Sequence, residues 1–161
     1  MTHVENPREN TCFGCGPEHP RGLRLSFEQV TADDGVKEVR TRFSPTSEET
    51  GWPTLFHHGL HFTVLYETSY WTALTLGGEL WTSFGPHQYT IVRLPRVGSA
   101  YEARGRIVRS GPEELTILAT TAAAAGKPCG RLETTWRPAR REALERAGIV
   151  LPAYLAQELS P

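Results

Sequence analysis

The stretch GWPTLFHHGLHFTVLYE, at residues 51–67, is the most informative segment of the chain. A loop with glycine and proline runs into two adjacent histidines and a glycine, and a long apolar segment follows. Between residues 50 and 78 the only Asp, Glu, Lys or Arg is Glu67. A lone carboxylate is costly to bury, so we expect Glu67 to have a specific role.

The apolar segment predicts a helix from about residue 57 to residue 76, ended by Gly77 and Gly78. It is long enough to raise the question of a membrane span. Three histidines, Glu67 and several hydroxyl residues interrupt it, which favours a helix buried inside a globular protein. Such a helix must be covered on most of its sides.

The rest of the chain reads mainly as strands. Alternating apolar residues predict strands at 23–28, 39–43, 80–84, 88–94, 101–108, 115–123 and 131–136, the first two forming a hairpin across a turn at 33–35. The alanine run at 122–125 is interpreted as a strand end, and short helices are expected at 139–147 and 152–159. The simplest architecture is α+β: a curved antiparallel sheet of five to six strands around one long helix, with a short helical C-terminal tail. Its open edges favour a homodimer or a dimer of dimers.

Composition narrows the class of protein. The 161 residues are 39% hydrophobic and 22% charged, as in an ordinary globular protein, and we expect one domain with an arm at 1–21, a core at 22–137 and a tail at 138–161. The net charge of −1 argues against nucleic-acid binding. Residues 1–10 lack an apolar signal core, and three cysteines make no secreted disulfide framework, so a cytoplasmic location is expected.

The segment also resembles a known family. Phenylacetate-pathway-type acyl-CoA thioesterases, which have the hot-dog fold, often read G-Y-P-G-x-x-H-G-G before an apolar helix carrying L-L-D-E; here the chain reads GWPTLFHHG at 51–59 and VLYE at 64–67. Their opening C-F-x-C-G-x-x-N-P-x-G-L is similar to CFGCGPEHPRGL at 12–23. The resemblance spans roughly residues 11–137 and implies the hot-dog fold and a soluble acyl-CoA substrate.

Two alignments place the catalytic acid of that family differently. If His57 is the motif histidine, Tyr66 stands at the acid position, and Trp71 then fits the end of the family helix. If His58 is the motif histidine, Glu67 takes the acid position, but the loop needs one extra residue. We favour the first alignment for ancestry, while Glu67 remains the only carboxylate in the helix for the chemistry.

The resemblance implies hydrolysis of an acyl-CoA thioester at the start of this helix. The N–H groups of a helix N-terminus suit a developing oxyanion, and Gly59 allows close approach of the substrate. A carboxylate in apolar surroundings suits a general base or nucleophile. The candidate catalytic residues are therefore His57, His58, Gly59, Tyr66 and Glu67. The two histidines as helix caps, and Glu67 as a structural acid bonded to backbone or to His61, are the alternatives.

Substrate contacts are expected from aromatic and basic side chains. Residues 93–109 contain five arginines against Glu102, a local charge of +4, and in the family basic residues near these strands meet the phosphates of coenzyme A. We select Arg93 and Arg96, which flank a turn. Trp52, Phe62 and Trp71 are candidates for the acyl pocket, with packing in the core as their alternative.

No metal or other cofactor is expected. Cys12 and Cys15 have the spacing of a metal-binding knuckle and His19 is near, but a structural zinc needs four ligands and Cys129 is the only other cysteine. Histidines one helical turn apart, such as His57 and His61, can also bind metal, but the family has no matching acidic ligand.

The leading hypothesis is thus an acyl-CoA thioesterase without a cofactor. The first alternative is a hot-dog protein that binds acyl-CoA or a related ligand without hydrolysing it, as Tyr66 at the acid position would suggest. A dehydratase on the same fold is a third, but its usual helix and loop signature is not visible.

Overall fold

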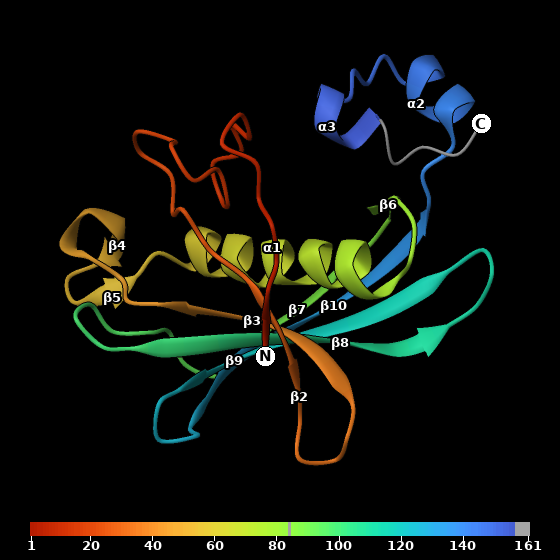
Figure 1. Cartoon of the computed structure of the whole chain (residues 1–161). Helices are drawn as coiled ribbons and strands as arrows, with labels where there is room; N and C mark the ends of the chain where they lie inside the picture. The colour runs from red at the N-terminus through yellow and green to blue at the C-terminus, as the bar shows by residue number, and fades with distance from the viewer. Residues whose placement is uncertain (84, 157–161) are drawn as a thin grey trace.

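The computed structural model describes residues 1–83 and 85–156, which form an α+β fold with one long helix lying across a curved antiparallel sheet (Figure 1). The strands are β1 (Thr2–His3), β2 (Glu28–Thr31), β3 (Lys37–Phe43), β4 (Thr50–Trp52), β5 (Leu55–Phe56), β6 (Trp81–Ser83), β7 (Gln88–Ile91), β8 (Tyr101–Ser110), β9 (Leu115–Ala123) and β10 (Pro128–Pro138). The helices are a 3₁₀ turn (Ser47–Glu49), α1 (His58–Leu76), α2 (Arg141–Arg146) and α3 (Ala153–Ala156). The predicted fold class is confirmed.

In the described residues the main sheet has eight strands in the order β1-β2-β3-β8-β9-β10-β6, with β7 also paired to β10. This exceeds the five to six expected: the arm adds β1, and the strands predicted at 80–84 and 88–94 both join the sheet, as the short β6 and β7 that pair with β10. The separate β4–β5 hairpin lies in the segment that was expected to be an irregular loop, just before α1.

Helix α1 begins and ends close to the predicted residues. Gly77 and Gly78 follow its last turn, and Gly78 has a φ of +79°, which glycine adopts without strain. The hydroxyls of Thr68 and Thr72 donate to the carbonyls of Val64 and Thr68, at 2.7 Å each. These polar side chains are therefore satisfied within the helix and can lie in the core.

The sheet face of α1 approaches β8 very closely. A Cβ at Gly105 in β8 would collide with the hydroxyl of Thr72 and lie 3.1 Å from the carbonyl oxygen of Thr68. Glycine at this position lets the helix and the sheet pack directly against one another. Leu65, Ala119 and Leu132 fill one part of the interface, and all three are buried.

The predicted strand at 23–28 was wrong in its position. β2 begins only at Glu28, and the residues before it pair with the arm instead: the N–H groups of Leu23 and Leu25 donate to the carbonyls of Phe13 and Gly14. Arg24, between them, has a φ of +50°, which is outside the strand region. The alternation at 23–27 thus reflects burial beneath the arm, not membership of the sheet.

The other predictions for the chain hold with small shifts. The hairpin between β2 and β3 turns at Gly35, which has a φ of +80°, and Ala122 and Ala123 end strand β9 as expected. The tail contains α2 and α3, while residues 157–159 of the predicted second tail helix lie outside the described residues. Within the described ranges, no helix has both the length and the apolar character that crossing a bilayer requires.

Candidate functional site

The N-terminus of α1 presents two exposed histidines. His57 is the N-cap: its Nδ1 accepts a hydrogen bond from the N–H of Gly59 at 3.0 Å, and its carbonyl accepts the first helical bond, from His61, at 2.9 Å. The rings of His57 and His58 are stacked, with centroids 4.7 Å apart. The capping alternative is therefore confirmed for His57, and the N–H of Gly59 is already engaged.

The loop that carries two candidate arginines lies beside this helix start. Leu55 forms a β-bridge with Arg96, and the N–H of Phe56 donates to the carbonyl of Pro95 at 2.8 Å. Arg93 and Arg96 are both exposed. The hairpin before α1 and residues 95–96 therefore lie side by side, just ahead of the histidine pair.

Two other arginines of the basic segment, Arg104 and Arg106, are engaged on the outer face of the sheet. Arg106 donates to Glu38 and Asp34, and Arg104 donates to Glu38 at 3.2 Å and to Glu102 at 2.5 Å. The Glu38 side chain is only 4% exposed. These pairs raise the pKa of both guanidinium groups, through the hydrogen bond to Glu102 for Arg104 and to Glu38 for Arg106. Arg93 and Arg96, like Arg109 near the end of β8, are exposed and take no part in these pairs.

His61 points away from the exposed pair and into the sheet. Its Nε2 lies 2.7 Å from the hydroxyl of Thr121 on β9, and its Nδ1 lies 2.8 Å from the hydroxyl of Tyr89 on β7. The Tyr89 hydroxyl also lies within hydrogen-bond distance of the carbonyl of His58, at 3.3 Å. Burial lowers the pKa of His61 to about 4, so the ring is neutral at pH 7. His61 is thus a structural histidine that does not join His57 in a metal site.

Tyr66 and Glu67 lie on different sides of α1. The Tyr66 ring lies in an aromatic cluster, with ring centroids 5.9 Å from Phe62, 5.5 Å from His87 and 5.7 Å from Trp136. Burial is the main cause that raises the pKa of its hydroxyl. Tyr66 therefore faces the edge of the sheet formed by β6, β7 and β10.

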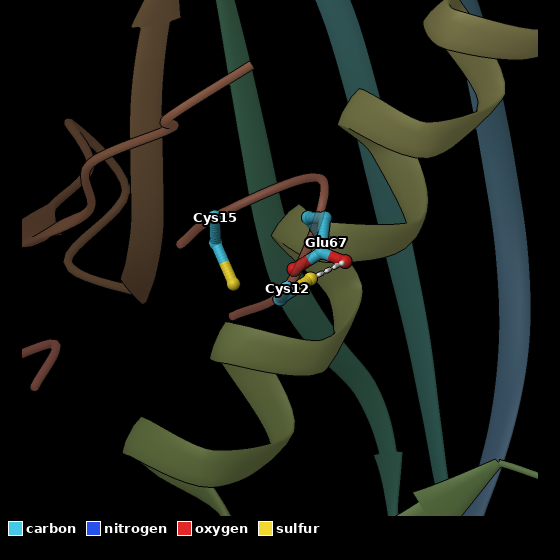
Figure 2. Close-up of side chains that lie close together, drawn as sticks. All are labelled: Cys12, Cys15 and Glu67. Carbon is cyan, nitrogen blue, oxygen red and sulfur yellow. Dashed lines mark hydrogen bonds between the residues drawn. The ribbon is translucent and has the colours of Figure 1, made fainter. Parts of the chain in front are cut away.

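Glu67 faces the N-terminal arm (Figure 2). Its Oε1 lies 3.2 Å from Cys12 Sγ, and Cys15 Sγ lies next to this pair, with all three ligand atoms within 4.8 Å of one another. Burial raises the pKa of Glu67 to about 8, with the charge of Cys12 as the second cause. A Cβ at Gly14 would collide with the Glu67 side chain. The arm therefore packs directly onto this carboxyl group.

The aromatic candidates for the acyl pocket are not brought together. Trp52 is 70% exposed on β4, near the start of α1. Phe62 stacks on Tyr66 at the sheet edge, while Trp71 is buried on the arm side and stacks on Phe27 with centroids 5.4 Å apart. Trp71 therefore packs in the core, which was the alternative to its role in an acyl pocket.

Sequence reasoning missed the meeting of the arm with Glu67. The sequence indicates each feature separately, the C-x-x-C pair as a possible knuckle and Glu67 as an unexplained acid, but 55 residues separate Cys12 from Glu67 in the chain. A contact at that separation has no signature in local spacing. One signal in the sequence could have linked them: the cysteine pair lacks further metal ligands nearby, and Glu67 lacks a charged partner in its own segment.

Comparison with solved structures identifies the fold. A thioesterase superfamily protein is matched with a TM-score of 0.68 and 19% identity, over 78% of this chain and 59% of that one. A Streptococcus mutans protein bound to acetyl-CoA is matched with a TM-score of 0.59 and 15% identity, over 69% and 86% of the two chains. The Escherichia coli PaaI protein from the phenylacetic acid degradation operon is matched with a TM-score of 0.60 and 12% identity, over 70% and 79%.

These matches confirm the hot-dog fold that the sequence resemblance implied. At 12–19% identity they establish the fold and not the activity. No protein-family model and no curated protein sequence matches the chain.

Proposed function

We propose that this protein hydrolyses an acyl-CoA thioester at the N-terminus of α1. The observation that carries the proposal is the exposed, stacked pair of His57 and His58 at the start of a buried helix, next to a loop with two exposed arginines. The fold supports it, since one protein with this fold was solved with acetyl-CoA bound.

The start of α1 supplies the electrostatic part of the reaction. The N–H groups of His58 and Leu60 precede the first helical hydrogen bond, which His61 makes. Together with the helix dipole they suit the negative charge that develops on the thioester oxygen. The N–H of Gly59 joins them only if the His57 ring turns away from its capping position.

We assign the activation of water to His58. It is exposed at the site, and an imidazole is the usual general base near neutral pH. It takes a proton from the water as the water oxygen bonds to the thioester carbon, and it returns this proton to the sulfur as the C–S bond breaks, so that the free acid and the coenzyme A thiol are released. Glu67 remains the second candidate because it is the only carboxylate in α1, although its contact with Cys12 directs it toward the arm.

The cofactor-free reaction needs contacts that hold coenzyme A. We assign its phosphates to Arg93 and Arg96, whose guanidinium groups form bidentate hydrogen bonds with phosphate oxygens. Trp52 and Phe62 are assigned to the acyl group. A homodimer, or a dimer of dimers, is part of the proposal, and light scattering on the purified protein measures it.

Ligand binding without hydrolysis is the second candidate function. The observation that favours it is the position of Tyr66, whose side chain lies among aromatic rings at the sheet edge while the nearby acid points elsewhere. A phenol with a raised pKa is a poor base at pH 7.

The test is the release of coenzyme A from aliphatic and aromatic acyl-CoAs, followed by chromatography so that the cysteines of the protein do not consume a thiol reagent. We expect the His58→Ala variant to lose about 100-fold or more in kcat, and His19→Ala, a change away from α1, to retain activity. If Glu67→Gln loses activity and His58→Ala does not, the base is Glu67.

Binding of coenzyme A, measured beside hydrolysis, separates the two candidate functions. We expect Arg93→Ala and Arg96→Ala each to weaken binding in calorimetry, while Arg131→Ala, an exposed arginine on β10, leaves it unchanged. Binding of coenzyme A without hydrolysis of any acyl-CoA would establish the second candidate function. Absence of both binding and hydrolysis would refute both candidate functions.

A further inference from the structure

We propose that Cys12, Cys15 and Glu67 form a binding site for a thiophilic divalent cation, with Zn²⁺ as the cation that fits their chemistry best. The arm and the middle of α1 contribute one donor set, in which two sulfur atoms and one carboxylate oxygen all lie within 4.8 Å of one another (Figure 2). Zn²⁺ accepts both thiolate and carboxylate ligands. This inference does not depend on the proposed hydrolysis.

Polar groups are directed at the two sulfur atoms. Cys12 Sγ lies 3.2 Å from Glu67 Oε1. The Asn10 amide donates to Cys15 Sγ at 3.3 Å. An N–H group directed at sulfur suits a metal-bound thiolate, because the thiolate is the form that binds metal.

The carboxyl group of Glu67 has an unused position in the same place. The residue is only 9% exposed, and its Oε2 has no hydrogen-bond partner among the described residues. A buried carboxylate oxygen without a partner is costly. A cation held between Glu67 and the two sulfur atoms would satisfy it, which no protein group in the described chain does.

The arm holds its two cysteines in place without help from a metal. The N–H of Gly16 donates to the carbonyl of Cys12 at 2.8 Å, and the N–H of Cys12 donates to Asn10 Oδ1 at 2.9 Å. The Asn6 amide donates to the carbonyl of Cys15 at 2.6 Å. The donor set is therefore preorganised, which lowers the entropic cost of binding.

The other metal-binding side chains considered from the sequence stay outside this cluster. His19 Nδ1 accepts from the N–H of Arg21, and its ring packs against Phe13. Cys129 lies on β10, where its thiol is directed at the carbonyl of Lys127. Three protein ligands leave one position for water, and the partial exposure of Cys12 provides access from solvent.

The experiment is a titration of the full chain with Zn²⁺, after treatment with a chelator and with a phosphine reductant present, in competition with a chromophoric chelator. We expect one Zn²⁺ per chain. With Co²⁺ as a substitute, we expect a thiolate-to-cobalt charge-transfer band and the intense visible bands of tetrahedral coordination.

The variants locate the site. Cys12→Ser and Glu67→Gln are expected to weaken Zn²⁺ binding by about 100-fold or more, beyond the effect usual for residues outside the ligand set. Cys129→Ser is the matched control and should bind as the unaltered protein does. Circular dichroism checks that each variant is folded. If Cys12→Ser fails to fold, Glu67→Gln still tests the site, because glutamine keeps the shape of the glutamate side chain.

Two results would overturn the proposal. One is the absence of stoichiometric Zn²⁺ binding by the reduced, folded chain. The other is binding that Glu67→Gln leaves unchanged, or that Cys129→Ser weakens as much as Cys12→Ser does. Because no acyl-CoA is present, these results are independent of whether the protein hydrolyses a thioester.

Discussion

The neutral, buried His61 makes the stability of the fold depend on pH in a way that one substitution can isolate. In the unfolded chain its pKa is near the ordinary 6.5, and in the folded protein burial lowers it to about 4. The unfolded state therefore binds more protons between these values, so stability falls as pH falls from about 6.5 to about 4. Tyr89, the titratable partner on β7, has a pKa raised to about 12 by burial and stays neutral throughout.

The magnitude follows from the two pKa values. A difference of one pKa unit corresponds to about 1.4 kcal/mol, so the full loss below pH 4 is about 3 kcal/mol. About 2 kcal/mol of this is already lost at pH 5. A change of that size is a large fraction of the stability of an ordinary domain.

Urea unfolding followed by tryptophan fluorescence at pH 7.5 and pH 5.0, with a chelator present, measures the effect. The unaltered protein and His61→Gln are compared, since glutamine keeps hydrogen-bonding groups near Thr121 and Tyr89 but does not titrate. We expect His61→Gln to be less stable at pH 7.5, with a gap that narrows by about 2 kcal/mol at pH 5.0. His3→Gln, at an exposed histidine, is the control. A gap of the same size at both pH values would refute the assignment of a neutral, buried His61.

Three further substitutions test the packing. Gly105→Ala would push a methyl group into Thr72 and is expected to cost about 1–3 kcal/mol, measured by thermal unfolding; an unchanged Tm would contradict the close helix–sheet contact. Trp136→Ala removes a side chain that is 1% exposed and should cost about 3–5 kcal/mol in urea unfolding, unless the aromatic cluster is poorly packed. Glu38→Gln removes the charge that two half-exposed arginines, Arg104 and Arg106, share, so we expect a loss of about 1 kcal/mol that shrinks at high salt; a loss independent of salt would argue for packing instead of charge.

Much of the fold followed from the sequence because its signals are local. The limits of α1 are set by residues at its own ends, with His57 as the cap and Gly77 and Gly78 at the other end, and they came within one residue of the prediction. Strand β9 was predicted at the residues it occupies. The strand at 23–28 was misplaced because burial beneath the arm produces the same alternation as a sheet.

The site was less accessible to sequence reasoning. The position of His58 at the exposed helix start follows from the motif, and its catalytic role remains a prediction. The direction in which Glu67 points depends on the arm, a segment without regular structure over most of its length. No periodicity relates Cys12 to Glu67, so only the folded chain brings the two observations together.

Two polar side chains of α1, His61 and Glu67, also determine the rotation of the helix about its own axis. His61 bonds to the sheet and Glu67 contacts the arm, and six residues of helix put them about 120° apart around the axis. Rotating the helix by one residue, about 100°, would leave both groups buried without these partners. Most other buried side chains of α1 are apolar or bonded within the helix, so they would tolerate several orientations. His61 and Glu67 thus select one orientation out of those that hydrophobic packing alone permits.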